Sequence, residues 1–313
     1  MIITKTPLRI SLLGGNTDFP KYFKKYGGAV LTTTIDKYIY CIVKERFDNE
    51  IWVNYSIKEK VLNVRDIKHD LVREAMNLVF NTSGAGLPSG IEITFLSDIP
   101  SEGSGLGSSS AVTVGVLNAL HNYKGEAVTA SQLAEEACKI EVDILKKPIG
   151  YQDQYAVAFG GQNMIHFRAK GITFTPGNLK NDDSLMLFYT GKTRDANKIL
   201  SKMKLNKKIL DRNKELVFEA YKGVALGDLL HEYWFLKRKL NKYVTDQVID
   251  LKYSDAISAG AIGGKIVGAG GGGFFLFVVP EDKKAAVRKA LGLRELTFNL
   301  SEHGSKVIFD ING

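Results

Sequence analysis

Residues 103–110 read GSGLGSSS, with three glycines at alternate positions, three serines and then an apolar segment. Gly103, Gly105 and Gly107 would let the backbone approach a ligand closely, at a cost in conformational entropy. The first amides of a helix have no acceptor within it, and the helix dipole attracts anions to that end. The stretch therefore predicts a phosphate-binding loop leading into a helix, and a tight loop with serine N-caps is the alternative.

A second glycine-rich stretch, GAGGGG at 268–273, matches the pattern GxGxxG but precedes the apolar segment FFLFVV. A dinucleotide-binding turn leads into a helix, so the context argues against a Rossmann fold. A P-loop has Lys followed by Ser or Thr after its last glycine, and neither glycine-rich stretch has that lysine. The sequence thus excludes both common nucleotide motifs.

Two acidic residues lie where catalysis could use them. Glu141 flanks the apolar face of a predicted helix in its C-terminal half, where the helix dipole disfavours a carboxylate by about 0.3–1 kcal/mol. A bound cation would reverse that effect, and a surface glutamate paired with Lys146 or Lys147 is the alternative. Asp153 follows a Pro and Gly break in KPIGYQDQYAVAFGG, where a lone aspartate would be interpreted as a helix N-cap.

The elements that must position these residues begin with strands. β-forming residues dominate KYIYCIVKERF, EIWVNYS and GIEITFLSD in the first hundred residues. Two helices are predicted next, the second of them with a capping box of Thr129 and Gln132. Their apolar faces contain Val112, Val116, Ala119 and Leu120 in the first, and Leu133, Ala137, Ile140 and Ile144 in the second.

The pattern changes near residue 170. SLMLFYTG predicts a buried strand, a Lys-rich helical region covers about 195–260, and FFLFVVP, a helix at about 281–291, LTFNL and KVIFD follow. We expect an α+β N-terminal domain over residues 1–170 and a smaller α+β domain over 171–313. The aromatic segment HEYWFLKRKL has the spacing of a packed helix, with a nucleobase platform as the alternative.

The composition of the 313 residues limits the function. Cys41 and Cys138 have no metal or disulfide spacing, the N-terminus does not resemble a signal peptide, and no run of about 18 apolar residues exists, so we expect a cytoplasmic protein with no membrane partner.

The net charge is +8, and residues 192–252 hold fifteen Lys or Arg against eight Asp or Glu. Because aromatic residues do not interleave with these charges, a solvated helix face or attraction of an anionic substrate is favoured over nucleic acid. The five histidines lack metal-binding spacing and are expected to be structural or superficial.

PSEGSGLGSSSA resembles the central motif of the GHMP small-molecule kinases, which wraps the ATP phosphates. KTPLRISLLGGNTDF and GGKIVGAGGGGFFLF resemble the N-terminal and C-terminal motifs of that family and occur in the same order. The resemblance implies a GHMP kinase fold, with an N-terminal domain like ribosomal protein S5 and a ferredoxin-like C-terminal domain. It also implies ATP and Mg²⁺ as cofactors, a small-molecule phosphosugar as substrate, and it allows a homodimer.

The resemblance further assigns roles to individual residues. Asp153 would be the general base, and Arg9 would hold it ionised and stabilise charge on the transferred phosphoryl group. The metal ligands would be Ser109 and Glu141. The phosphate-binding residues would be Gly103, Ser104, Gly105, Leu106, Gly107, Ser108, Ser109 and Ser110. The substrate-binding residues would be Gly15, Asn16, Thr17, Asp18, Gln152, Arg194, Gly271 and Gly272, with Arg194 on a distal phosphate.

The N-terminal motif also bears on the substrate. Galactokinases carry a Glu-His pair where this chain has Gly15-Asn16, which argues against galactose. GGNTDFPKYF, YQDQYAVAFGG and YTGKTRDANKIL are most similar to the family branch that phosphorylates the anomeric hydroxyl of D-glycero-D-manno-heptose 7-phosphate, giving the 1,7-bisphosphate for nucleotide-heptose and surface polysaccharide synthesis. A fucose-type 1-kinase for a neutral sugar is the main alternative. A silent sugar sensor would be expected to lose Asp153 or Glu141, and a diphosphate decarboxylase would lack the sugar-type motif.

Overall fold

The computed structural model describes residues 1–81, 88, 90–100, 103–177, 184–193, 196–203 and 205–311. Within these ranges nine strands form one sheet. They are β1 (Ile2–Leu13), β2 (Gly28–Glu45), β3 (Ile51–Asn54), β4 (Lys58–Val61), β5 (Ile91–Ser97), β6 (Gln162–Arg168), β7 (Gly171–Pro176), β12 (Leu300–Ser301) and β13 (Lys306–Asp310). Apart from the parallel β3–β5 pair, neighbouring strands run antiparallel.

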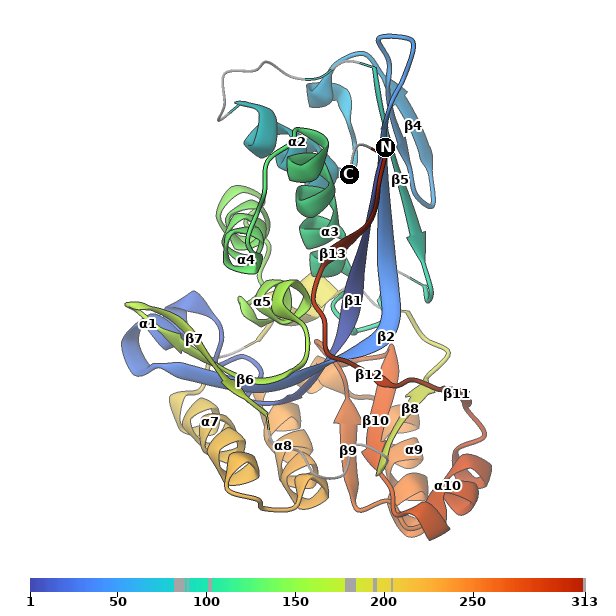
Figure 1. The fold of residues 1–313 in the computed structure, drawn as a ribbon. Coiled ribbons are helices and arrows are strands. Elements are labelled where there is room, and N and C mark those ends of the chain that lie inside the picture. Colours follow the sequence, from blue (N-terminus) through green and yellow to red (C-terminus); the bar gives the residue numbers. More distant parts are fainter. Residues whose placement is uncertain are drawn as a thin grey trace.

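Strand β2 organises this sheet. Its sequence, GAVLTTTIDKYIYCIVKE, is rich in β-branched and aromatic residues, which suit a long pleated strand. Residues 28–33 pair with β6, residues 39–45 pair with β5, and β1 runs antiparallel along most of its length. Figure 1 shows β2 running down the sheet and curving beneath the helices, so the strand links the helix-covered face to the second half of the molecule.

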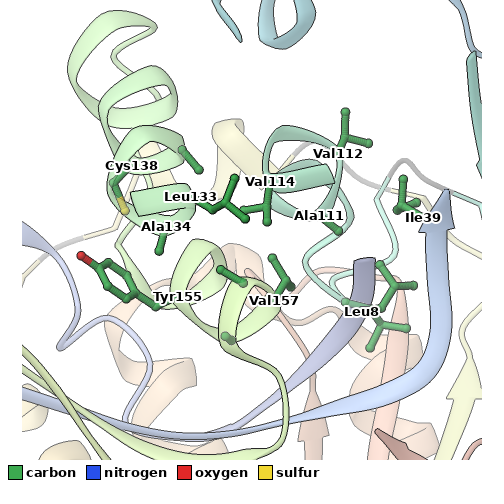
Figure 2. Packing of buried hydrophobic residues seen from close by; sticks show 14 of the residues in the cluster. Leu8, Ile39, Ala111, Val112, Val114, Leu133, Ala134, Cys138, Tyr155 and Val157 are labelled. Atoms are coloured by element: carbon green, nitrogen blue, oxygen red, sulfur yellow. The ribbon is translucent and has the colours of Figure 1, made fainter. Parts of the chain in front are cut away.

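Four helices pack against one face of the sheet: α2 (Asp70–Asn81), α3 (Ser108–Tyr123), α4 (Ala130–Cys138) and α5 (Gln152–Phe159). Helix α3 lies centrally, in contact with β1, β2 and the other three helices. We expected a single apolar face on α3, yet nearly the whole helix is buried, because the sheet and three helices surround it. Figure 2 shows its Val114 facing Leu133 of α4 and Val157 of α5.

The second predicted helix continues beyond α4 as a π-helical turn, Lys139–Ile144. The capping box is half formed, because Thr129 accepts a hydrogen bond from the Gln132 amide at 3.2 Å while the Gln132 side chain donates to Glu136. Ile144 was expected on the buried face and is 43% exposed. The i→i+5 bonding of a π-turn rotates the following residues away from a 3.6-residue periodicity, which accounts for that difference.

A second sheet of four antiparallel strands has the order β11-β8-β10-β9 among the described residues. The strands are β8 (Leu185–Tyr189), β9 (Gly263–Ile266), β10 (Phe274–Val278) and β11 (Arg294–Leu296). The helices of this part are α6 (Ala196–Ser201), α7 (Lys207–Tyr221), α8 (Leu226–Leu240), α9 (Gln247–Ser258) and α10 (Lys284–Leu291). The strand order and the helical crossovers give the expected ferredoxin-like arrangement. GAGGGG forms the β9–β10 connection between two strands, which agrees with the exclusion of a Rossmann turn.

The larger sheet does not end at residue 170. Strand β7 pairs with β6, so a boundary at 170 would cut a hairpin. Strands β12 and β13 return from the C-terminal part to pair with β2 and β1, and the two chain ends lie close together in Figure 1. The expected division into 1–170 and 171–313 therefore does not follow the strand pairing. The sequence could not show this, because β1 and β13 residues that pair are about 300 residues apart and leave no local signal.

The Lys-rich segment forms helices whose charges are partly paired, for example Lys207 with Asp211 and Arg238 with Asp250. Cys41 and Cys138 are buried free thiols. In the described part of the chain no helix has both the length and the apolar character needed to cross a bilayer.

Candidate active site

A cavity of about 1360 Å³ lies where the two sheets and their helices meet. Its walls come from the end of β1 and the loop after it, from the starts of α2, α3 and α5, from the π-helical turn, and from α6, α8 and the β9–β10 connection. Single-ligand sites are commonly about 300–1000 Å³, so this cavity has room for two substrates side by side.

The predicted phosphate-binding loop forms one wall of the cavity. Gly103, Gly105 and Gly107 all have positive φ, at 69°, 80° and 77°, which explains why glycine occurs at alternate positions. The first intrahelical bond of α3 runs from the Ala111 amide to the Gly107 carbonyl, so the amides of residues 108–110 stand at the helix N-terminus facing the cavity. This geometry suits an anion with several oxygens.

Two residues of that loop point away from the ligand space. Ser104 and Leu106 are buried and do not belong to the cavity lining. The Ser104 hydroxyl accepts a hydrogen bond from the Leu106 amide at 3.3 Å, and the Leu106 carbonyl accepts one from the Arg9 amide at 2.9 Å. These two residues hold the loop in shape, while the flanking glycines and serines face the ligand space.

Arg9 and Asp153 form a two-point ion pair at the centre of the cavity. Arg9 Nε donates to Asp153 Oδ1 at 2.8 Å and Nη2 donates to Oδ2 at 2.6 Å. Arg9 Nη1 donates to the Gly105 carbonyl at 2.7 Å, so one buried guanidinium ties the carboxylate to the phosphate loop. Asp153 lies in the first turn of α5 and makes no capping bond there, and its side chain is 27% exposed. The carboxylate is thus oriented by Arg9 and open to the cavity.

Glu141 is fully buried in the π-helical turn, beneath the start of α3. Its carboxylate accepts hydrogen bonds from Ser109 Oγ at 3.2 Å and from Gln154 Nε2 at 3.1 Å. Burial raises the pKa of this carboxyl, a shift that Lys147 partly opposes. The alternative, a surface glutamate paired with Lys146 or Lys147, does not fit the described contacts, because Glu141 is buried and the Lys147 ammonium lies 3.7 Å from Asp70. A buried carboxylate without a full cationic partner is an expensive arrangement that a bound cation would relieve.

Ser109 and Glu141 fit a magnesium ion better than a transition metal. Across the described residues no group of three or more His, Cys, Asp or Glu could hold a metal. Magnesium takes one or two carboxylates together with phosphate oxygens and water, and a hydroxyl and a carboxylate next to a phosphate loop match that requirement. The raised pKa of Glu141 is consistent with a site that binds a cation.

The loop after β1 supplies a second acidic group. Asp18 is buried, its Oδ2 accepts a hydrogen bond from the Gln152 amide at 3.0 Å, and its Oδ1 has no partner within the described structure. Burial raises the Asp18 pKa to about 6. Gly15, Asn16 and Gln152 line the cavity beside it, and Gln152 Oε1 is also buried without a partner. Unpaired acceptors that face a cavity suit the hydroxyl groups of a ligand.

Three other predicted substrate residues, Thr17, Gly271 and Gly272, do not line the cavity. Thr17 is buried and bonds through its hydroxyl to the Gly14 and Ala29 carbonyls, so it shapes the loop. Gly271 and Gly272 are not among the lining residues, whereas Gly268 and Ala269 are. Arg194 lies outside the described residues.

Sequence reasoning missed a group from the C-terminal part of the chain. Tyr233 of α8 and Lys265 of β9 line the cavity, and the Lys265 ammonium lies 4.3 Å from the centre of the Tyr233 ring. Lys237 of α8 lines it too, and its ammonium donates to the Ile266 and Gly268 carbonyls at 2.9 and 2.6 Å. The segment HEYWFLKRKL does form a packed helix, as predicted, but it also presents Tyr233 to the cavity.

Another part of the cavity lining is aromatic. Tyr55 meets His69 edge to face at a centroid distance of 4.7 Å, and His69 stacks on Phe95 at 5.9 Å. All three residues line the cavity. His69 was expected to be structural or superficial, and its place here shows that it faces the ligand space.

Comparison with known proteins agrees with this geometry. The family model described as GHMP kinases N terminal domain matches residues 70–161, and that described as GHMP kinases C terminal matches residues 220–295. A curated D-glycero-alpha-D-manno-heptose 7-phosphate kinase from Campylobacter jejuni is 34% identical to this chain over 93% of both sequences. The chain belongs to the GHMP kinases.

Other GHMP kinases resemble the chain at lower identity. An L-fucokinase/L-fucose-1-P guanylyltransferase from Bacteroides fragilis is 28% identical over 91% of this chain, which spans 35% of that longer protein. The crystal structure of a D-glycero-D-manno-heptose 1-phosphate kinase from Bacteroides thetaiotaomicron superposes with a TM-score of 0.78 at 27% identity over 99% of both chains. A Lactococcus lactis galactokinase, at 19% identity and a TM-score of 0.75, shares the fold.

The site has the parts that an ATP-dependent kinase requires. Phosphoryl transfer depends on holding the nucleotide phosphates and aiming an acceptor hydroxyl in line, with little covalent work for the protein. The glycine loop and the α3 N-terminus suit the first need, and the carboxylates near the loop after β1 suit the second. The chain is an ATP-dependent kinase by its family, and this arrangement makes the cavity the candidate active site.

Proposed function

We propose that this GHMP kinase transfers the γ-phosphoryl group of ATP to the anomeric hydroxyl of D-glycero-D-manno-heptose 7-phosphate, giving the 1,7-bisphosphate for nucleotide-heptose and surface polysaccharide synthesis. The observation that carries the proposal is the 34% identity to a heptose 7-phosphate kinase over 93% of both chains. The three segments that resemble this branch in the sequence, around residues 14, 151 and 189, support it.

In this proposal the two ends of the cavity hold different substrates. The adenine would lie among Tyr55, His69 and Phe95, whose rings offer stacking faces. The triphosphate would lie along residues 103–110, and the sugar would lie between Asp153 and the loop after β1. The unpaired Oδ1 of Asp18 and Oε1 of Gln152 would accept hydrogen bonds from sugar hydroxyls.

The chemical step is then direct. Asp153 accepts the proton of the anomeric hydroxyl, the freed oxygen forms a bond to the γ-phosphorus, and the bond between that phosphorus and the bridging oxygen breaks with its electrons going to ADP. Arg9 aims the Asp153 carboxylate at the acceptor through two hydrogen bonds. Its third bond, to the Gly105 carbonyl, fixes the distance between base and phosphate loop.

Ser109 and Glu141 would hold magnesium at the floor of the phosphate loop. When bound there, the ion neutralises charge on the β- and γ-phosphates. Gln154 donates to the other oxygen of Glu141 and fixes the orientation of that carboxylate.

A fucose-type 1-kinase is the second candidate, supported by the 28% identity to an L-fucokinase over 91% of this chain. The same Asp18, Asp153 and Arg9 would serve a neutral sugar. The two candidates differ in whether the acceptor carries its own phosphate.

The test is ADP release with Mg-ATP across heptose 7-phosphate, mannose 6-phosphate, fucose, galactose and mevalonate, with Asp153→Ala measured alongside. Turnover on heptose 7-phosphate, a new anomeric phosphorus signal in the product and loss of both in the variant are the expected results. Turnover on fucose alone would replace the substrate and keep the kinase. Binding of ATP without turnover on any sugar would refute the proposed activity.

A further inference from the structure

Lys265 is a buried lysine with no anionic partner among the residues that the structure describes. It lies in β9, is 1% exposed, and lines the acceptor end of the cavity. Among the described contacts its ammonium has neither a hydrogen-bond acceptor nor a carboxylate, and the one interaction it makes is with the Tyr233 ring at 4.3 Å. A buried ammonium without a hydrogen-bonding partner is costly unless something else in the functional complex supplies one.

A second buried lysine nearby provides a comparison within the same site. Lys237 is 4% exposed and donates to two backbone carbonyls, those of Ile266 and Gly268, which flank the turn after Lys265. The carbonyls of this turn are therefore engaged by Lys237. Lys237 has the bonding pattern of a lysine that stabilises the fold, and Lys265 does not.

The surroundings of Lys265 are cationic. Burial together with the positive charges of Lys237 and Arg9 lowers the pKa of Lys265 well below its usual range. Arg9 is already paired with Asp153, and that carboxylate is the proposed base. The described residues thus place a further basic group beside the reacting groups and supply no anion to balance its protonated form, so an anionic ligand at this point would stabilise the ammonium.

The position of Tyr233 locates that ligand. The Tyr233 hydroxyl lies close to Gly15, since a Cβ placed on Gly15 would be 2.7 Å from it, and Gly15 belongs to the loop that carries Asp18. The ring of the same tyrosine contacts Lys265. Lys265 therefore borders the space between the loop after β1 and Arg9.

We propose that the ammonium group of Lys265 binds a phosphate oxygen in the reacting complex, at the acceptor end of the cavity. The proposal rests on the proposed kinase function, which brings phosphate to this cavity in two forms. One is the phosphate that the acceptor sugar itself carries, and the other is the phosphoryl group in transfer. Both present the same chemistry to an ammonium, and kinetics separates them.

The test compares Lys265→Met with the wild-type enzyme on heptose 7-phosphate and on the corresponding unphosphorylated heptose. A charge-assisted hydrogen bond in a buried site contributes enough that its loss changes a rate or an affinity by about tenfold or more. If Lys265 binds the phosphate of the sugar, KM for heptose 7-phosphate rises by that factor while kcat and the kinetics on the neutral sugar stay unchanged. If it binds the transferred group, kcat falls on both acceptors and the KM values change little.

Two further variants separate binding from folding. Lys265→Arg keeps a cation and should recover part of the loss. Lys252→Met removes a lysine of α9 that donates to the Leu291 carbonyl and lies outside the cavity, and it should leave the kinetics unchanged. Melting temperatures of all variants identify any that are misfolded. If Lys265→Met is misfolded, the kinetics of Lys265→Arg are compared with those of the wild-type enzyme instead.

The proposal fails if Lys265→Met is folded and retains wild-type kcat and KM on every acceptor, because the lysine would then only pack against Tyr233. It also fails if KM for ATP alone changes. An incorrect substrate proposal is recognised separately, as absence of wild-type turnover on heptose 7-phosphate, and Lys265→Met is then assayed on whichever acceptor the wild type uses. If no acceptor is turned over, titration of inorganic phosphate into the Mg-ADP complex decides: tenfold weaker binding by Lys265→Met supports the proposal, and equal binding overturns it.

Discussion

Substituting Arg9 by lysine tests the proposed coupling between the base and the phosphate loop. The guanidinium makes three hydrogen bonds of 2.6–2.8 Å, two to Asp153 and one to the Gly105 carbonyl. Lysine keeps the positive charge, but a single ammonium cannot replace the planar fork that spans both partners. Arg9→Lys therefore disrupts the hydrogen-bond geometry of the site and leaves its net charge unchanged.

The magnitude follows from the bonds lost. Losing two of three charge-assisted hydrogen bonds at about 1.5–3 kcal/mol each gives about 3–6 kcal/mol. Asp153 is 27% exposed, so water replaces part of the interaction and the lower end applies. About 3 kcal/mol corresponds to a loss of about 100-fold in kcat/KM. Because Arg9 also supports the phosphate loop, we expect KM for ATP to rise and kcat to fall.

The assay is steady-state ADP release for Arg9→Lys, Asp153→Asn and the double variant. If Arg9 acts through Asp153, the double variant loses little more than Asp153→Asn alone. Arg46→Lys is the matched control, because Arg46 also makes a two-point contact with an aspartate, Asp48, at a site outside the cavity. Arg9→Lys activity within threefold of wild type, or fully additive losses in the cycle, would contradict the reasoning.

Three further predictions concern other residues. Glu141→Gln removes a buried carboxylate whose pKa is raised, so the ligand-free protein should melt at a higher temperature. Its activity at a fixed Mg²⁺ concentration should fall at least about tenfold. A fall in both the melting temperature and the activity would indicate a purely structural glutamate. Asp18 has its pKa raised from 3.8 to about 6, so in the native state it binds more protons than in the unfolded state between these pH values. Its contribution to stability is therefore present below about pH 4 and is lost as the pH rises through 6, a change of about 3 kcal/mol, and Asp18→Asn should stabilise the ligand-free protein at pH 8 but not at pH 4 in calorimetry. Gly273→Ala places a Cβ 2.4 Å from the Ser104 carbonyl oxygen at φ +83°, whereas Gly292→Ala, at φ +57°, meets open space. Denaturant titration should show that the free energy of unfolding falls by about 1 kcal/mol for Gly292→Ala and by clearly more for Gly273→Ala. Equal decreases would show that the contact with Ser104 relaxes freely.

Local features of the site were predictable from the sequence. The glycines at 103, 105 and 107 predicted a loop whose backbone can approach a ligand closely, and the structure gives all three the positive φ angles that glycine adopts at little cost. The placement of Glu141 against the helix dipole suggested that the residue had a function, and the structure finds it buried beneath the phosphate loop. Both inferences depend only on residues within one or two helical turns of each other.

The residues that the C-terminal part of the chain contributes to the site and to the larger sheet could not be predicted in the same way. Tyr233 lies in a helix whose aromatic residues are mostly required for packing, so its type and spacing carry no separate signal. Lys265 occurs in GGKIVGAGGGGFFLF, where the sequence draws attention to the glycines, and its burial depends on how β9 packs against the rest of the chain. Strand β13 pairs with β1 across nearly the whole chain length, which leaves no local pattern.

The contact between the two glycine-rich stretches connects these observations. Gly273, at the end of the β9–β10 connection, lies so close to the carbonyls of Gly103 and Ser104 that no side chain fits there. The phosphate loop is therefore supported from the C-terminal part of the chain as well as by Arg9. The same hairpin carries Lys265 on β9, a few residues before that contact. One hairpin therefore both contacts the phosphate loop, through Gly273, and carries Lys265, which pairs with Leu276 of β10. In-line transfer requires the γ-phosphoryl group and the acceptor hydroxyl to be held at a set separation, and a common support for the phosphate loop and Lys265 serves that requirement.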